Sequence, residues 1–154
     1  MKIFKILLIF TFVFIFVACE DKKEKNVLIK KEIPTTSDRW YSEDMLEKGK
    51  TIYANNCASC HGKNGEGVIL PWNEKMDNDL YPPPPLNDDA HAWHHPLKAL
   101  RFTIREGGKP VGGVMPPFKD KLSSEDIDNV IAHFQSFWTD PYYKEWLRRN
   151  GLNK

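Results

Sequence analysis

The run Cys57-Ala58-Ser59-Cys60-His61 lies in the first half of this 154-residue chain, directly after a segment with helical spacing. Two thiols separated by two residues match the two vinyl groups of a haem, and each thiol can add to one vinyl as a thioether. The histidine beside the second thiol is then placed under the iron. The run therefore predicts one covalently bound haem c, attached through Cys57 and Cys60, with His61 as the proximal iron ligand.

A close cysteine pair in an exported chain has other uses, which include a disulfide and a zinc site. A thioredoxin-type redox pair needs a strand, a turn and a helix around it, and no alternating strand pattern of useful length occurs here. A zinc site needs a second set of ligands, which His91, His94 and His95 could supply as a distant alternative. Haem attachment is the main interpretation.

The second iron ligand is expected to be a soft one, because sulfur ligation raises the reduction potential. Met115 stands in Gly112-Gly113-Val114-Met115-Pro116-Pro117-Phe118. Two prolines stiffen the backbone after the methionine, and two glycines before it allow a tight turn. The pattern predicts that this loop presents the Met115 sulfur to the iron. Met76 is the main rival ligand, and packing in the core is the alternative role for Met115.

The N-terminus is typical of a secretion signal, with a positively charged start and an apolar run. The stretch Phe16–Cys19 resembles a bacterial lipoprotein box, with Phe in place of the usual Leu. We expect residues 1–18 to be a lipoprotein signal peptide, Cys19 to be lipidated, and residues 19–38 to be a flexible tether. A retained signal anchor is the alternative, but the apolar run is shorter than the roughly 20 residues of a membrane span.

The rest of the chain has the pattern of an all-α domain over residues 39–140, followed by a C-terminal extension over residues 141–154. Capping residues and apolar spacing predict helices from about Glu43 to Asn55, from Leu97 to Arg105, and onward from a cap at Ser123. A short tail helix is expected within the extension. Long segments rich in Gly and Pro separate the helices. Loops of this length are uncommon in a compact domain, and wrapping a cofactor would account for them.

The stretch from about Glu43 to Trp138 resembles a class I cytochrome c, here in the form of a bacterial lipoprotein. Gly49 and Tyr53 match the glycine and the aromatic residue of that family's N-terminal helix. The resemblance implies a cytochrome c fold with long loops around one haem. It also implies that the N-terminal helix packs against the C-terminal helix through Ile131 and Phe134.

The same resemblance implies a proline carbonyl that accepts a hydrogen bond from the proximal histidine and raises its basicity. Pro84, within the run Pro82–Pro85, is the candidate for that carbonyl, although four consecutive prolines leave the register open by one.

The function expected from these features is outer-sphere electron transfer between a redox donor and a redox acceptor at the outer face of a bacterial membrane. The carrier would not be an enzyme by itself, and the inner membrane is slightly favoured. The formal net charge is +1, and no basic stripe dominates the sequence, so no nucleic-acid partner is expected. One alternative is a cytochrome subunit of a larger oxidoreductase. Another is a haem or copper-handling protein that uses His91, His94 and His95.

Overall fold

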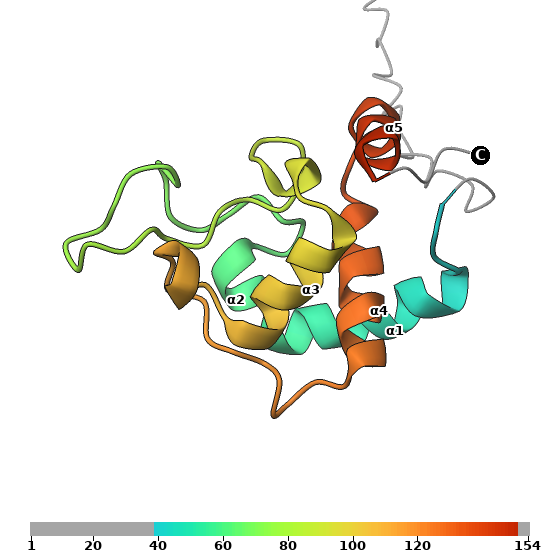
Figure 1. Cartoon of the computed structure of the whole chain (residues 1–154), viewed down its shortest axis with the longest axis horizontal. Coiled ribbons are helices and arrows are strands. Elements are labelled where there is room, and N and C mark those ends of the chain that lie inside the picture. The colour runs from blue at the N-terminus through green and yellow to red at the C-terminus, as the bar shows by residue number, and fades with distance from the viewer. Residues whose placement is uncertain (1–38, 151–154) are drawn as a thin grey trace, which may run out of the picture. The chain divides into compact units, whose positions relative to one another are not determined.

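The computed structural model describes residues 39–150, which form the all-α domain expected from the sequence (Figure 1). The signal peptide, Cys19 and the tether predicted over residues 19–38 lie outside the described residues. Within residues 39–150 there is no strand, and Tyr81 and Gly113 form an isolated bridge. None of the helices in this range is long and apolar enough to cross a bilayer. The elements in chain order are α1 (Glu43–Asn56), α2 (Ala58–His61), the 3-10 turn η2 (Ala92–His94), α3 (Leu97–Glu106), the 3-10 turn η3 (Lys109–Val111), α4 (Ser124–Gln135) and α5 (Asp140–Arg149).

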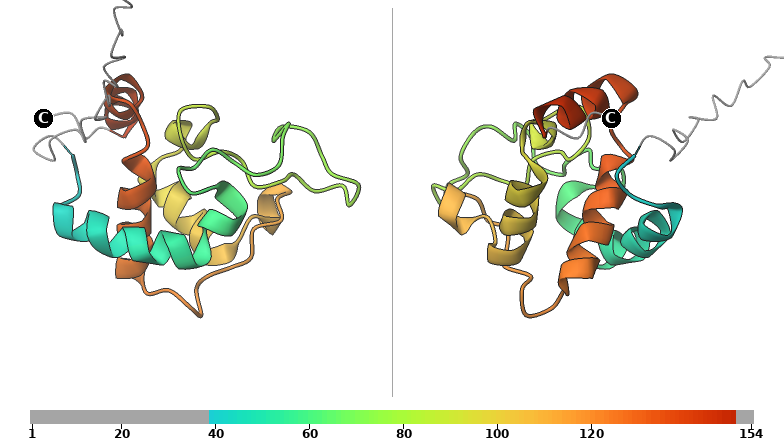
Figure 2. Two further views of the ribbon diagram at one scale, coloured as in Figure 1. Left: turned by 180° about the vertical axis from the view of Figure 1, so that it is seen from behind. Right: turned by 45° about the vertical axis from the view of Figure 1, so that its right-hand side comes forward.

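Helices α1 and α4 cross at close range and form the largest helix contact of the domain (Figure 2). Gly49 of α1 lies against the backbone carbonyl of Asn129, and any Cβ at this position would clash with that carbonyl and press on His133. The predicted packing of these two helices is confirmed, and the α4 atoms nearest to Gly49 belong to Asn129 and His133. Helix α4 is buried around most of its circumference, so several of its faces make contacts.

Capping residues fix the helix ends where the sequence places them. Ser42 begins α1 by accepting a hydrogen bond from the Met45 amide at 3.3 Å. Ser123 and Asp126 begin α4 with a reciprocal capping box, in which each side chain accepts from the other's amide at 3.0 Å. Gly107 ends α3 with a positive φ of 82° that a glycine adopts without strain. The predicted limits of α1 and α3 are correct to within one residue.

Helix α5, the expected tail helix, packs against η2 and extends the core. Trp138 and Trp146 are fully buried and lie 6.0 Å apart between ring centroids. Trp146 Nε1 donates to the carbonyl of His95 at 2.9 Å. Asn150, just after α5, accepts a hydrogen bond from the Leu97 amide at 3.1 Å and so caps the first turn of α3. Two hydrogen bonds, to His95 and to Leu97, thus hold the C-terminal segment against the start of α3.

Candidate functional site

A cavity of about 640 Å³ lies between α2, α3, η3 and the proline-rich loop. Its volume is within the usual range of roughly 300–1,000 Å³ for ligand pockets. Cys57, His61, Pro84 and Met115 all line it, so the structure brings four of the predicted site residues to one cavity. The wall is mainly apolar, with side chains that include Tyr53, Leu86, Leu100, Ile104, Val114, Val130 and Phe134.

His61 ends the short helix α2 and is only 6% exposed. Its Nδ1 lies 2.7 Å from the carbonyl oxygen of Pro84, the proline chosen from the run of four. Because a carbonyl can only accept, Nδ1 carries the proton and the lone pair is on Nε2. Burial lowers the pKa of His61, which favours the neutral imidazole that a metal ion requires. The hydroxyl of Tyr53 donates to the carbonyl of Gly62 at 2.8 Å and ties α1 to the residue after His61.

The two cysteines of the motif lie on one helical turn, because the carbonyl of Cys57 accepts from the amides of Cys60 and His61 at 3.1 and 2.9 Å. Neither thiol is in a disulfide. Cys57 is half-buried in the cavity wall, and Cys60 is exposed and outside the wall. Burial, with a further contribution from the Cys60 thiol, raises the pKa of the Cys57 thiol to about 11. The site therefore offers one buried and one accessible thiol beside the same histidine.

Met115 reaches the cavity from the loop between η3 and α4. Its carbonyl accepts from the amide of Gly108 at 2.9 Å, and the amide of Gly113 donates to the carbonyl of Gly108 at 2.9 Å. These bonds fasten the loop to the segment that follows α3. Met76, the rival ligand, does not line the cavity.

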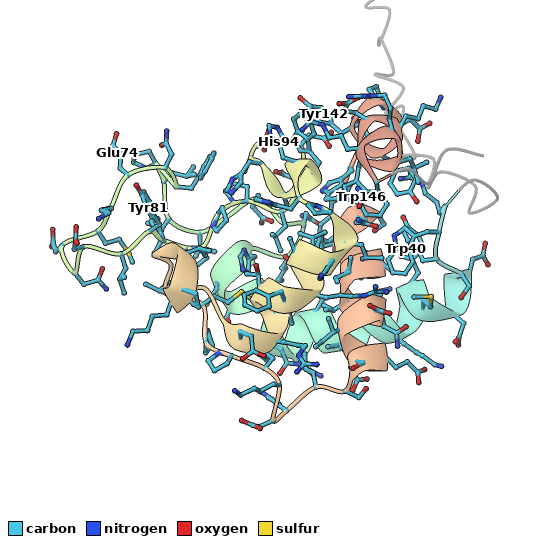
Figure 3. All side chains as sticks on the ribbon, in the orientation of Figure 1. Trp40, Glu74, Tyr81, His94, Tyr142 and Trp146 are labelled. Atoms are coloured by element: carbon cyan, nitrogen blue, oxygen red, sulfur yellow. The ribbon has the colours of Figure 1, made fainter. Side chains whose placement is uncertain are left out.

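The histidine-rich segment divides at the cavity. His91 and His95 line it, with ring centroids 5.1 Å apart, whereas His94 does not. The ring of His94 packs edge-on against Trp93, with ring centroids 3.7 Å apart, and Trp93 in turn contacts Tyr142 of α5 at 4.9 Å; His94 and Tyr142 are labelled in Figure 3. Across residues 39–150 no group of three or more His, Cys, Asp or Glu side chains is placed to hold a metal ion. The copper alternative gains no support from this part of the chain.

Two aromatic residues of the cavity wall were not anticipated from the sequence. Trp72 stacks on His91, with ring centroids 4.9 Å apart and an interplanar angle of 21°. Tyr81, labelled in Figure 3, is held to the far loop by its amide, which donates to the carbonyl of Gly112 at 2.8 Å. Both residues stand in irregular segments without periodicity, so nothing in the sequence gives the direction of their side chains.

These residues fit a haem. Two thiols and an imidazole on one helical turn match covalent attachment and proximal ligation, and a thioether in the same cavity matches the second axial position. The apolar wall suits the porphyrin ring, which is flat and largely hydrophobic.

A family model described as "Cytochrome C oxidase, cbb3-type, subunit III" matches residues 44–134, more than half of the chain. The cbb3-type cytochrome c oxidase subunit FixP of Azorhizobium caulinodans is 35% identical over 94 residues, which cover 58% of this chain and 28% of that protein. Cytochrome c6 of Bryopsis maxima is 30% identical over 89 residues, which cover 57% of this chain and 86% of that protein. The chain spans less than a third of the length of the FixP relatives it matches.

Among solved structures, cytochrome cL from Methylophaga aminisulfidivorans matches with a TM-score of 0.50 and 20% identity, over 68% of this chain and 61% of that one. This likeness concerns the fold alone. The family match and the cavity together identify the chain: it belongs to the family of cbb3-type cytochrome c oxidase subunit III, and it is a class I cytochrome c with one covalently bound haem c.

Proposed function

We propose that this chain is an electron carrier in which Cys57 and Cys60 would attach the haem and His61 and Met115 would bind its iron. The bound haem supplies a one-electron iron couple. The observation that carries the proposal is the 2.7 Å hydrogen bond from His61 to Pro84, since it directs the free nitrogen lone pair of His61 away from the protein backbone in a cavity that Met115 shares.

The residues of this chain then have three tasks. Pro84 fixes the orientation of the His61 ring and increases its basicity. The apolar wall excludes water from the cofactor. Two protein ligands on the iron leave no open position for a substrate, so the chain would pass electrons between redox proteins and would not be an enzyme by itself.

Exposed lysines near the Met115 loop can attract redox partners through their charge. Lys109 and Lys121 are exposed on either side of the Met115 loop, and Lys119 pairs with Glu106 at 3.3 Å. Charges at the rim of a redox interface mainly affect the association rate and its dependence on salt. We infer acidic surfaces on the donor or the acceptor.

We further infer that the domain is exported and held at the outer face of a bacterial membrane through lipid on Cys19. Support comes from the apolar leader and the lipoprotein-like box that ends at Cys19. More than one acyl chain on this cysteine would give stable anchoring, whereas a single chain would not.

A second candidate is a cytochrome subunit of a larger oxidoreductase. It is favoured by the match to subunit III of cbb3-type oxidases and by the FixP relatives. Purification of the native protein in mild detergent distinguishes the two: a free carrier elutes alone, and a subunit elutes in a stoichiometric complex with other chains.

Replacement of Met115 by Ala tests the proposed ligation. The ferric protein should lose the weak absorption band at the red end of the spectrum that sulfur ligation produces, its reduction potential should fall, and the reduced iron should bind carbon monoxide quickly. Met76→Ala is the matched control and should leave all three properties unchanged, because Met76 does not line the cavity. An unchanged potential in Met115→Ala would contradict the assignment.

A further inference from the structure

A loop over residues 63–79, called the acidic loop below, projects from the helices to one side of the domain (Figure 1). Three consecutive aliphatic side chains on this loop face solvent: Val68 is 54% exposed, Ile69 41% and Leu70 69%. Single exposed apolar residues are ordinary on a protein surface, but a contiguous apolar stretch with a charged rim is typical of a contact with another molecule.

The rim of this apolar stretch is acidic. The loop has an excess of two acids, since it contains Glu66, Glu74, Asp77 and Asp79 against Lys63 and Lys75. Asp79 is paired with Lys75 at 2.8 Å, whereas Glu74 and Asp77 have no ion-pair partner within residues 39–150. Figure 3 shows Glu74 on the projecting part of the loop. The loop therefore presents aliphatic side chains together with uncompensated negative charge.

A groove of about 600 Å³ between α3 and α4, called the basic groove below, has the opposite charge. Its α3 side carries Lys98, Arg101 and Arg105, which share one face of the helix by their spacing of three and four residues. Phe102 lies among them and is 55% exposed. Like the acidic loop, the basic groove thus combines an exposed apolar group with charge.

Two of the three cations in the groove are open to a partner. Arg101 is held by Asp128 through hydrogen bonds of 2.6 and 2.8 Å. Lys98 has no ion-pair partner in the described part of the chain, and Arg105 lies 3.6 Å from Glu106, a long ion pair. Helix α3 has an excess of two cations, which matches the excess of two acids in the loop.

The two surfaces are complementary but do not meet within one molecule. No residue of the acidic loop lines the basic groove. In Figure 1 the loop extends away from α3 and α4, which form the groove. A second copy of the chain therefore supplies the matching surface for each of them.

We propose that copies of this protein dock head to tail, with the acidic loop of one copy in the basic groove of the next, and that electrons pass from copy to copy along this contact. The inference rests on the proposed function, since it names a partner of the electron carrier. In each step the iron of one copy loses one electron and is oxidised, and the iron of its neighbour gains that electron and is reduced. Because the two surfaces differ, the contact can repeat along a chain of copies or close into a ring.

Both surfaces border the cavity that fits the haem. Trp72, which follows the aliphatic stretch of the loop, lines this cavity, and so does Phe102 of the groove. Docking of the loop in the groove consequently brings the cavities of two copies toward each other with an aromatic side chain on each side.

The contact is expected to be weak and transient. A single loop in a groove buries less than the roughly 1,200 Å² typical of stable interfaces. The proposed lipid on Cys19 would hold many copies in one plane and so raise their effective concentration. Salt should weaken the contact, because its charges are exposed.

Sedimentation equilibrium tests the docking on the full-length, haem-loaded protein in mild detergent, with micelles in excess and the haem absorption as the signal. The mass of the wild type should rise with protein concentration in dilute buffer and return to that of a monomer in about 1 M salt. The variants E74K/D77K and K98E/R105E should each weaken association by about tenfold, because like charges then face each other. The combined variant E74K/D77K/K98E/R105E should regain it, since the two surfaces have exchanged their charges.

The matched control is K50E/K144E, which changes the net charge as K98E/R105E does but at exposed sites on α1 and α5. It should associate like the wild type. A wild type that stays monomeric at all concentrations would overturn the inference. So would association that is unchanged in both charge-reversed variants, or a combined variant that binds haem and does not regain association.

Electron exchange between copies gives a second measurement. In mixtures of reduced and oxidised protein, NMR line broadening should show an exchange rate that falls about tenfold in K98E/R105E and recovers in the combined variant. Equal rates in the wild type and K98E/R105E would overturn the inference. The optical spectrum separates the two proposals: absence of the sulfur-ligation band removes the proposed iron ligation, whereas a normal spectrum with monomeric protein removes only the docking of copies.

Discussion

At the scale of single residues, the absence of one Cβ sets how closely α1 and α4 approach. Gly49 costs α1 about 1 kcal/mol of helix propensity relative to alanine. The close approach of the two helices requires this glycine, because a side chain there would clash with the carbonyl of Asn129, a backbone group that cannot rotate away.

Gly49→Ala should therefore destabilise the protein by about 2 kcal/mol, since the strain of overpacking, roughly 1–3 kcal/mol, exceeds the gain in propensity. Urea unfolding of the haem-loaded protein measures the change. Thr51→Ala, an exposed site on the same helix, should change little. Equal stability of Gly49→Ala and wild type would mean that the two helices are farther apart than described here.

Individual site residues differ in how far the sequence reveals them. Cys57, Cys60 and His61 are recognisable because their chemistry depends on spacing along the chain, and the position of Met115 follows from the stiff loop around it. His91 and Trp72 meet across 19 residues of irregular chain. Such a pairing depends on tertiary packing, which no local pattern encodes.

At the scale of elements, capped helices were predictable and the loops were not. The ends of α1 and α3 follow from Ser42 and Gly107, whose effects are local. The long segment between α2 and η2 is instead shaped by distant partners, as when Trp138 Nε1 donates to the carbonyl of Leu86 at 2.7 Å. The α4 residues that lie nearest to Gly49 also depend on tertiary packing, since helical spacing alone does not rank the faces of a helix that is buried nearly all round.

Helix α5 contributes to the core through Trp146, which is fully buried and hydrogen-bonded to the carbonyl of His95. Trp146→Ala should cost about 3–5 kcal/mol, because it leaves a large cavity and an unpaired carbonyl. Thermal or urea unfolding measures the loss, with Lys144→Ala on the exposed face of α5 as the control. A loss below about 1 kcal/mol would show that α5 is not part of the folded core.

At the scale of the whole molecule, the proposed lipid on Cys19 would hold the redox domain at a membrane. Cys19→Ser should move the protein from the membrane fraction to the soluble extract of the outer compartment, with the haem spectrum retained, because the cavity is lined by residues far from Cys19 in the sequence, between Tyr53 and Phe134. Immunoblots of fractionated cells give the result. A variant that stays in the membrane would favour a retained signal anchor over lipid.

Covalent attachment of the haem underlies the proposed electron transfer. Mass spectrometry of the tryptic peptide 51–63, which contains both cysteines of the motif, tests it in protein matured by a host that attaches haem. The peptide should carry the added mass of one haem, and the variant C57S/C60S should carry none. A wild-type peptide with two unmodified cysteines would contradict the account.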